Sequence, residues 1–172
     1  MKDVTTAVVA GNPRPNSRTL AAAIELTRSL TGPDPDLVVD LATVGPALLD
    51  WSAPEVAELV QQVGDADLVV VASPTYKGTY TGLLKLFLDR FDAGTGLRGI
   101  AVPFMLGGSP AHSLAPELSL RPVLTELGAT VPGRAPYVVD SRWDDPGAYV
   151  DWLAATRPLV TGLLRARVGV TA

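Results

Sequence analysis

The sequence predicts an α/β protein in which helices cover both faces of a doubly wound parallel sheet. Short apolar runs alternate with helix-like segments along the whole chain, which is the pattern of repeated strand–helix units. The run Asp67–Ala72 (DLVVVA) is apolar almost throughout, as a parallel strand buried on both faces should be. A chain of 172 residues can bury one core without disulfides or metals, so we expect a single domain over residues 1–172.

Each element has its own signal. Strand signals occur in five stretches, which are residues 4–10, 36–41, 67–72, 99–106 and 135–140. Helix signals follow in residues 19–30, 54–63, 79–91, 113–127 and 146–167. Gly32–Pro33 ends the first helix, and Gly45–Pro46 forms a turn before the second. Because right-handed crossovers leave few strand orders open, five such units favour the flavodoxin-like order 2-1-3-4-5.

The composition excludes several classes of function. The chain has no cysteine, which removes disulfides, thiolate metal sites and thiol redox chemistry, and we expect no metal site. With 14 basic against 18 acidic residues, it has no net positive field for a nucleic acid. No stretch approaches the roughly 18 apolar residues of a membrane span, and the apolar run at residues 7–10 is too short for a secretory signal. We therefore expect a cytoplasmic protein that has neither a nucleic acid nor a membrane as partner.

In a sheet of this order, ligands bind beyond the carboxyl ends of the strands, where the strand order reverses. The candidate site then lies in three loops, residues 11–19, 73–79 and 107–112. The first loop opens a helix, and the free backbone N–H groups there, with Arg14 and Arg18, favour an anion such as phosphate. The loop is neither a dinucleotide fingerprint nor a P-loop. The alternative is that a polar residue only caps the helix and both arginines are solvated.

The other two loops offer a flat ring and open backbone. Tyr76 and Gly78 place an aromatic ring beside backbone that a planar heterocycle can approach, unless Tyr76 is only a surface aromatic. Gly107 and Gly108 follow a buried strand and can turn their amides to a ligand edge. His112 is the only histidine, and without a catalytic partner in the sequence we expect it behind the site or as a helix cap.

The three loops together resemble a known family. Residues 10–19, 72–78 with 82–85, and 107–112 are similar to the NADPH-dependent FMN reductases, closest to their alkanesulfonate-utilisation branch, and the resemblance covers about residues 4–140. It implies that the FMN phosphate is held by Asn12, Arg14, Ser17, Arg18 and Thr19. It implies that the isoalloxazine is flanked by Pro74, Thr75, Tyr76, Lys77 and Gly78, and that its polar edge is met by Gly107, Gly108 and Ser109.

Two positions depart from the family's pattern. Asn12 stands where the family has a serine, which keeps the polarity and changes the donor geometry. Leu118 stands where reductases of the sulfonate branch often carry a tyrosine, associated with an inserted residue that bulges the fourth helix. Without that tyrosine, the resemblance favours a tightly held FMN over a flavin that is released.

The resemblance implies hydride transfer from NADPH or NADH to N5 of FMN, followed by delivery of electrons or reduced flavin to a monooxygenase or another acceptor. No side-chain acid or base is required, and none of the three loops holds a carboxylate pair. A flavodoxin-type electron carrier and an FMN-dependent quinone or azo-dye reductase are the alternatives. Arg14 and Arg18 argue against the first, because flavodoxins hold phosphate with neutral, hydroxyl-rich loops.

The third and fourth predicted helices carry more apolar positions than one sheet-facing stripe requires. Charged residues make up 19% of the chain, below the roughly 25% of typical domains. We therefore expect a homodimer or homotetramer, with Tyr80 or Leu118 at a subunit boundary near the flavin.

Overall fold

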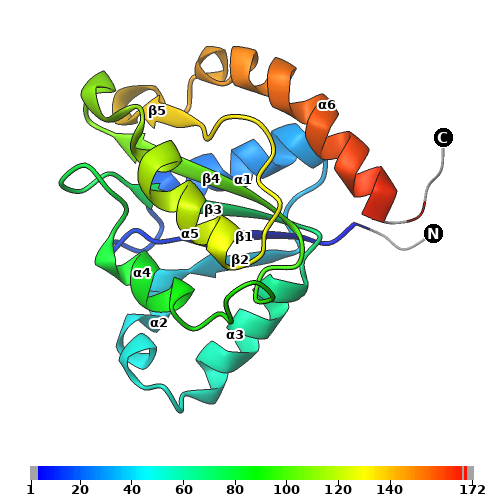
Figure 1. Ribbon diagram of the computed structural model, residues 1–172. Coiled ribbons are helices and arrows are strands. Elements are labelled where there is room, and N and C mark those ends of the chain that lie inside the picture. Colours follow the sequence, from blue (N-terminus) through cyan, green and yellow to red (C-terminus); the bar gives the residue numbers. More distant parts are fainter. Residues whose placement is uncertain (1–3, 168, 170–172) are drawn as a thin grey trace.

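The computed structural model describes residues 4–167 and 169 and confirms the predicted sheet (Figure 1). All strands are parallel, in the order β2-β1-β3-β4-β5. They are β1 (Thr6–Ala10), β2 (Leu37–Asp40), β3 (Leu68–Pro74), β4 (Ile100–Gly107) and β5 (Tyr137–Val139). This is the flavodoxin-like arrangement. Residues 1–3, 168 and 170–172 of the predicted domain lie outside the described residues.

Helices form a layer on each face of the sheet (Figure 1). One layer holds α1 (Arg18–Thr31) and α6 (Val150–Arg167), and the other holds α3 (Pro54–Asp65), α4 (Gly82–Leu88) and α5 (Arg121–Glu126). Strand side chains alternate between the layers, so that Val8 faces α1 and its neighbour Val9 faces the opposite layer. The result is two apolar cores. None of the helices within the described ranges combines the length and apolar character that crossing a bilayer requires.

Two predicted boundaries differ from the structure because of local capping. After β2 the chain forms a short helix, α2 (Leu41–Val44), where the sequence predicted only a turn, and the Asp40 carboxylate accepts a hydrogen bond from the Ala42 N–H (3.2 Å). The third predicted helix begins later than expected, at Gly82. Thr81 is extended and its Oγ1 accepts a hydrogen bond from the Leu84 N–H (3.1 Å), which makes it the N-cap of α4.

The fourth predicted helix is interrupted. Pro116–Leu120 forms a π-helical turn in which the Arg121 N–H bonds to the Pro116 carbonyl, and only α5 continues as a regular helix. Pro122 gives the physical reason: it has no N–H, and in a regular α-helix its ring would press on the Leu118 carbonyl. The bulge is therefore present although residue 118 is a leucine. The missing tyrosine is no basis for expecting that FMN is held tightly.

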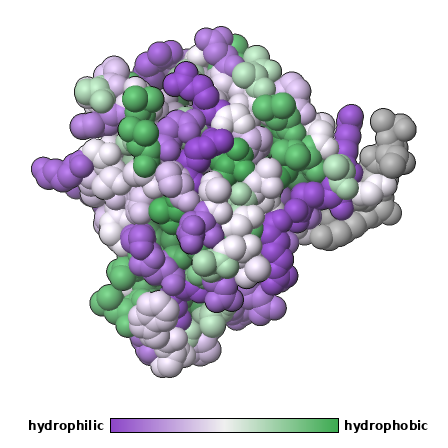
Figure 2. Space-filling model, in the orientation of Figure 1, coloured by the Kyte–Doolittle hydropathy of each residue, from purple (hydrophilic) through white to green (hydrophobic). Residues whose placement is uncertain are grey.

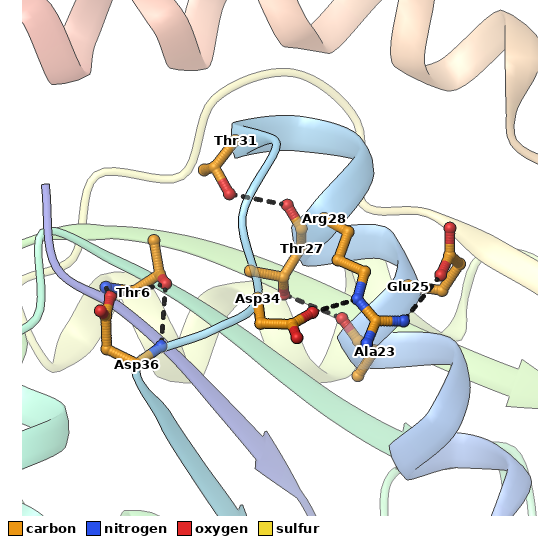
Figure 3. A network of polar contacts seen from close by, with 8 residues as sticks. All are labelled: Thr6, Ala23, Glu25, Thr27, Arg28, Thr31, Asp34 and Asp36. Atoms are coloured by element: carbon orange, nitrogen blue, oxygen red, sulfur yellow. Dashed lines mark hydrogen bonds and ion pairs between the residues drawn. The ribbon is translucent and has the colours of Figure 1, made fainter.

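A polar network fixes the connection between α1 and β2 (Figure 3). The Asp36 carboxylate accepts hydrogen bonds from the Thr6 N–H (2.7 Å) and the Thr6 hydroxyl (3.0 Å). Near the end of α1, the Arg28 guanidinium contacts the carboxylates of Asp34 and Glu25. The bonds of Asp36 to Thr6 hold the start of β2 beside β1 at the amino-terminal edge of the sheet, opposite the three predicted loops, and Arg28 ties the intervening loop to α1.

Candidate functional site

The loops that follow β1, β3 and β4 meet at the carboxyl edge of the sheet, on the left in Figure 1. They border an open cleft of about 530 Å³, a size typical of ligand sites. The cleft is lined by ten of the predicted contact residues: Asn12, Arg14, Ser17, Arg18, Thr19, Pro74, Thr75, Tyr76, Gly107 and Gly108. Lys77, Gly78 and Ser109 are not among the residues that line it. The edge predicted from topology is therefore where the structure gathers most of the predicted residues.

The first loop is shaped by Asn12. Its Oδ1 accepts a hydrogen bond from the Arg14 N–H (2.9 Å), and its Nδ2 donates to Thr19 Oγ1 (3.1 Å). Asn16 adopts a left-handed conformation (φ 52°), which asparagine tolerates, and its N–H donates to Asp40 Oδ2 (2.8 Å). Asn12 thus uses its amide to form the loop, while the Thr19 hydroxyl keeps its proton available for a ligand.

The start of α1 presents donors to the cleft. Ser17 is the N-cap, since its Oγ accepts a hydrogen bond from the Leu20 N–H (3.2 Å). The backbone N–H groups of Arg18 and Thr19 have no acceptor within the described ranges, as expected for a first helical turn. The Arg14 guanidinium is exposed, and among the described residues no side chain or carbonyl forms a hydrogen bond or ion pair with it. This combination of free N–H groups, hydroxyls and cationic charge suits a phosphate.

Arg18 is engaged by a carboxylate that sequence reasoning missed. Its Nη1 lies 2.7 Å from Oδ2 of Asp140, the residue that follows β5, and both side chains line the cleft. Both are partly exposed, at 61% for Arg18 and 45% for Asp140. A signal was available, because Asp140 ends the fifth predicted strand and so had to lie at the carboxyl edge. Each arginine of the loop therefore has a different environment.

The second loop closes in a tight turn. The Tyr76 N–H donates to the Thr79 carbonyl (2.9 Å) and the Thr79 N–H donates back to Tyr76 (3.3 Å). Lys77 and Gly78 at the tip both have positive φ, of 55° and 82°, as this two-residue turn requires. A Cβ on Gly78 would lie 3.9 Å from His112 Cδ2. His112 is thus exposed near the tip and does not line the cleft, whereas Tyr76 lines the cleft and is half exposed.

Thr75 provides a test of whether the cleft fits a polar ligand. Its backbone N–H donates to the Leu106 carbonyl (2.6 Å), but its buried Oγ1 has no hydrogen-bond partner among the described residues. The hydroxyl of the neighbouring Tyr137 donates its own proton to the Ser109 carbonyl (2.6 Å). A buried hydroxyl without a partner is costly, so a ligand atom that bonds to it gains free energy. A flavin, with its ring nitrogens and carbonyls, carries such atoms.

The two glycines of the third loop have different reasons to be glycine. A Cβ on Gly107 would lie 2.0 Å from Tyr137 Oη, so this position makes room for the tyrosine. Burial raises the pKa of the Tyr137 hydroxyl, which stays protonated as the donor to Ser109. A Cβ on Gly108 would meet no atom within 4 Å. Gly108 therefore leaves backbone open to the cleft, and Gly107 is structural.

Thr81 links the first loop to the second through buried hydrogen bonds. Its Oγ1 donates to the Gly11 carbonyl (2.5 Å) and accepts from the Leu84 N–H, and its own N–H donates to Ser73 Oγ (3.1 Å). A Cβ on Gly11 would lie 2.5 Å from Leu84 Cβ, which shows how closely the first loop packs on α4. The first and second loops thus share one buried anchor.

Another hollow of the protein has nearly the same volume as this cleft. A hollow of about 510 Å³ lies between β5 and α6, with Trp152 and Leu159 among its mostly apolar lining. It is away from the carboxyl edge of β1 and β3. In the described part of the chain, no group of three or more His, Asp or Glu residues is placed to bind a metal ion. The chemistry of the lining, rather than size, identifies the candidate site.

A five-stranded parallel sheet in the order 2-1-3-4-5, with helices on both faces, places the chain in the class of flavodoxin-like proteins. The sequence pattern of the NADPH-dependent FMN reductases matches residues 4–144, so the chain belongs to that family.

Relatives with known names support this membership. The FMN reductase (NADPH) of Escherichia coli (strain K12) is 32% identical over 125 residues, 70% of this chain and 65% of that protein. The FMN reductase (NADPH) of Pseudomonas putida (strain KT2440) is 38% identical over 79 residues, 46% of this chain and 40% of that protein. The chain thus matches less than two thirds of the length of these two proteins. The apo structure of an NADH:FMN oxidoreductase, EMOB, superposes with a TM-score of 0.81 at 29% identity, covering 95% of this chain and 90% of that one.

Proposed function

We propose that this chain reduces FMN with a hydride from NADPH or NADH. Its relatives are named FMN reductase (NADPH) and NADH:FMN oxidoreductase, and both nucleotides are therefore candidate donors. One observation carries the proposal. The lining of a single cleft combines Arg14 from the loop before α1, the aromatic side chain of Tyr76, and Thr75, whose buried hydroxyl has no hydrogen-bond partner among the described residues.

The residues of the cleft divide into two groups. The hydroxyls of Ser17 and Thr19, the N–H groups at the start of α1 and the guanidinium groups of Arg14 and Arg18 would hold the phosphate. Asn12 would act indirectly by holding the loop in shape.

A second group would hold the ring of the flavin. Pro74 and Tyr76 would flank it, the Thr75 hydroxyl would bond to one of its polar atoms, and Gly108 would let its edge approach the backbone. When bound, FMN supplies the N5 atom that accepts the hydride. The protein would hold the flavin and the nucleotide in position, and hydride transfer itself needs no side-chain acid or base. Lys77, Gly78 and Ser109 would shape the loops around it.

We further propose that the electrons or the reduced flavin pass to a separate acceptor, such as a monooxygenase. The cleft is open and its two arginines are exposed, which suits a flavin that enters and leaves. With a quinone or an azo dye as the acceptor, the reduction of FMN would be the same. The two functions would differ only in the step that reoxidises the flavin.

The phosphate assignment is tested by titrating the protein with FMN and with riboflavin, which lacks the phosphate. Arg14→Ala should weaken FMN binding by about 1.5–3 kcal/mol and leave riboflavin binding unchanged, because a charge-assisted hydrogen bond is lost. Arg157→Ala is the matched control, since this exposed arginine lies on α6, outside the cleft. Equal affinity of the unmodified protein for FMN and riboflavin would contradict the assignment.

We also propose that the chain assembles as a homodimer or homotetramer. Leu114 and Leu118, on either side of the start of the π-helical turn, are 52% and 73% exposed. Figure 2 shows apolar areas as separate patches among polar ones on the face it presents. Exposed leucines next to the third loop would become buried if a second copy packed there, which is the reason for the proposal.

A further inference from the structure

We propose that Asp140 weakens the binding of FMN by competing with its phosphate for Arg18. This inference rests on the proposed function and adds a residue that controls how tightly the flavin is held. It starts from the 2.7 Å ion pair between Arg18 Nη1 and Asp140 Oδ2 inside the lining of the cleft.

The position of the pair gives Asp140 access to the phosphate site. Arg18 is the first residue of α1, directly after the N-cap Ser17, so its side chain starts where an anion would bind. Asp140 reaches the Arg18 guanidinium from the end of β5, and both residues line the same cleft. The pair joins residues 122 positions apart in the chain, and no other cation contacts Asp140 within the described residues.

A phosphate that binds to the Arg18 guanidinium would find the Asp140 carboxylate already bound there. Arg18 would either release Asp140 or hold two anions side by side. Release costs the ion pair, and sharing places like charges close together. In both cases Asp140 makes phosphate binding less favourable than it would be with a neutral side chain.

Arg14 provides an internal comparison. Its guanidinium has no carboxylate partner in the described part of the chain, so its attraction for phosphate is unopposed. Asp40 is the other carboxylate beside the loop, and it is already held by the N–H groups of Asn16 and Ala42. Asp140 is thus the acidic group that acts directly on a phosphate-binding arginine.

The consequence fits a flavin that has to leave after reduction. An exposed ion pair is worth little, so the competition changes affinity by a small factor and does not abolish binding. We expect Asp140→Asn to bind FMN about fivefold more tightly, equivalent to about 1 kcal/mol at 1.4 kcal/mol per tenfold. We expect its affinity for riboflavin to stay unchanged.

The experiment measures dissociation constants of FMN and riboflavin by flavin fluorescence for five proteins. These are the unmodified chain, Asp140→Asn, Arg18→Ala, the Arg18→Ala/Asp140→Asn double variant, and the control Asp144→Asn. Asp144 is exposed and lies four residues further on without contacting Arg18. Competition predicts tighter FMN binding in Asp140→Asn alone, with most of the gain lost when Arg18 is absent.

Each other outcome overturns the inference. Weaker FMN binding in Asp140→Asn would mean that the carboxylate orients Arg18 for the phosphate. Unchanged binding, or an equal gain in Asp144→Asn, would mean that the ion pair does not act on the phosphate. The proposed function fails separately, if the unmodified chain binds FMN but neither NADPH nor NADH reduces it.

Discussion

Replacing Thr81 tests whether one buried hydroxyl holds the two loops of the cleft together. Thr81 is 4% exposed, and Thr81→Ala removes the donor to the Gly11 carbonyl and the acceptor for the Leu84 N–H. Loss of the N-cap costs about 1 kcal/mol. A buried carbonyl left unpaired costs about 1–3 kcal/mol more. The expected loss in the free energy of unfolding is therefore about 2–4 kcal/mol.

Thr81→Ser is the matched control, because it keeps the oxygen and removes only a methyl group, worth about 0.8 kcal/mol. The assay is urea denaturation followed by circular dichroism, without added flavin, so that ligand binding does not contribute to stability. The alanine variant should also bind FMN less tightly than the serine variant, because the first loop loses its anchor. Equal stability of the alanine and serine variants would refute the role given to the hydroxyl.

Three further predictions concern the loops, the pH dependence and the assembly. Gly107→Ala should lower the free energy of unfolding by about 1–3 kcal/mol, because the new Cβ would meet the Tyr137 hydroxyl. Gly108→Ala is the control and should change it by no more than about 0.5 kcal/mol. Equal urea midpoints for the two variants would contradict this prediction. Burial raises the pKa of Tyr149 to about 12, so the folded state keeps this proton while the unfolded state loses it, and stability should fall as the pH rises from about 10 to about 12. Tyr149→Phe should reduce this fall in the free energy of unfolding, measured by denaturation at each pH. An unchanged pH dependence in the variant would contradict the prediction. Light scattering should give at least twice the chain mass of 18.0 kDa, and Leu118→Glu should reduce it; an unmodified chain of 18.0 kDa would contradict assembly.

The sheet could be predicted because its signal is local. A buried run such as Asp67–Ala72 indicates a parallel strand by itself, and the handedness of crossovers then leaves few strand orders. That order by itself puts the first, second and third loops at one edge of the sheet. Arg14 and Tyr76, which are far apart in sequence, were predicted at one site for that reason.

The features that were missed depend on contacts between distant residues. The ion pair of Arg18 with Asp140 joins positions 122 residues apart; the end of the fifth strand places Asp140 at the carboxyl edge, but no local pattern says which cation it meets. The bond from Thr81 to the Gly11 carbonyl joins positions 70 residues apart and has no local signal. The π-helical turn was missed for a different reason. A proline at position 122 is incompatible with a regular helix, but the sequence alone does not say whether the chain kinks or widens to avoid the Leu118 carbonyl.

The most direct test of the central claim is anaerobic stopped-flow mixing of the FMN-loaded protein with NADPH or NADH. We predict that the absorbance of oxidised flavin is lost in a step whose rate depends on the nucleotide, and that it returns when an acceptor is added. Arg157→Ala should behave like the unmodified chain. If neither nucleotide reduces the bound FMN while a separate reductase does, the chain is an electron carrier and the proposed function is wrong.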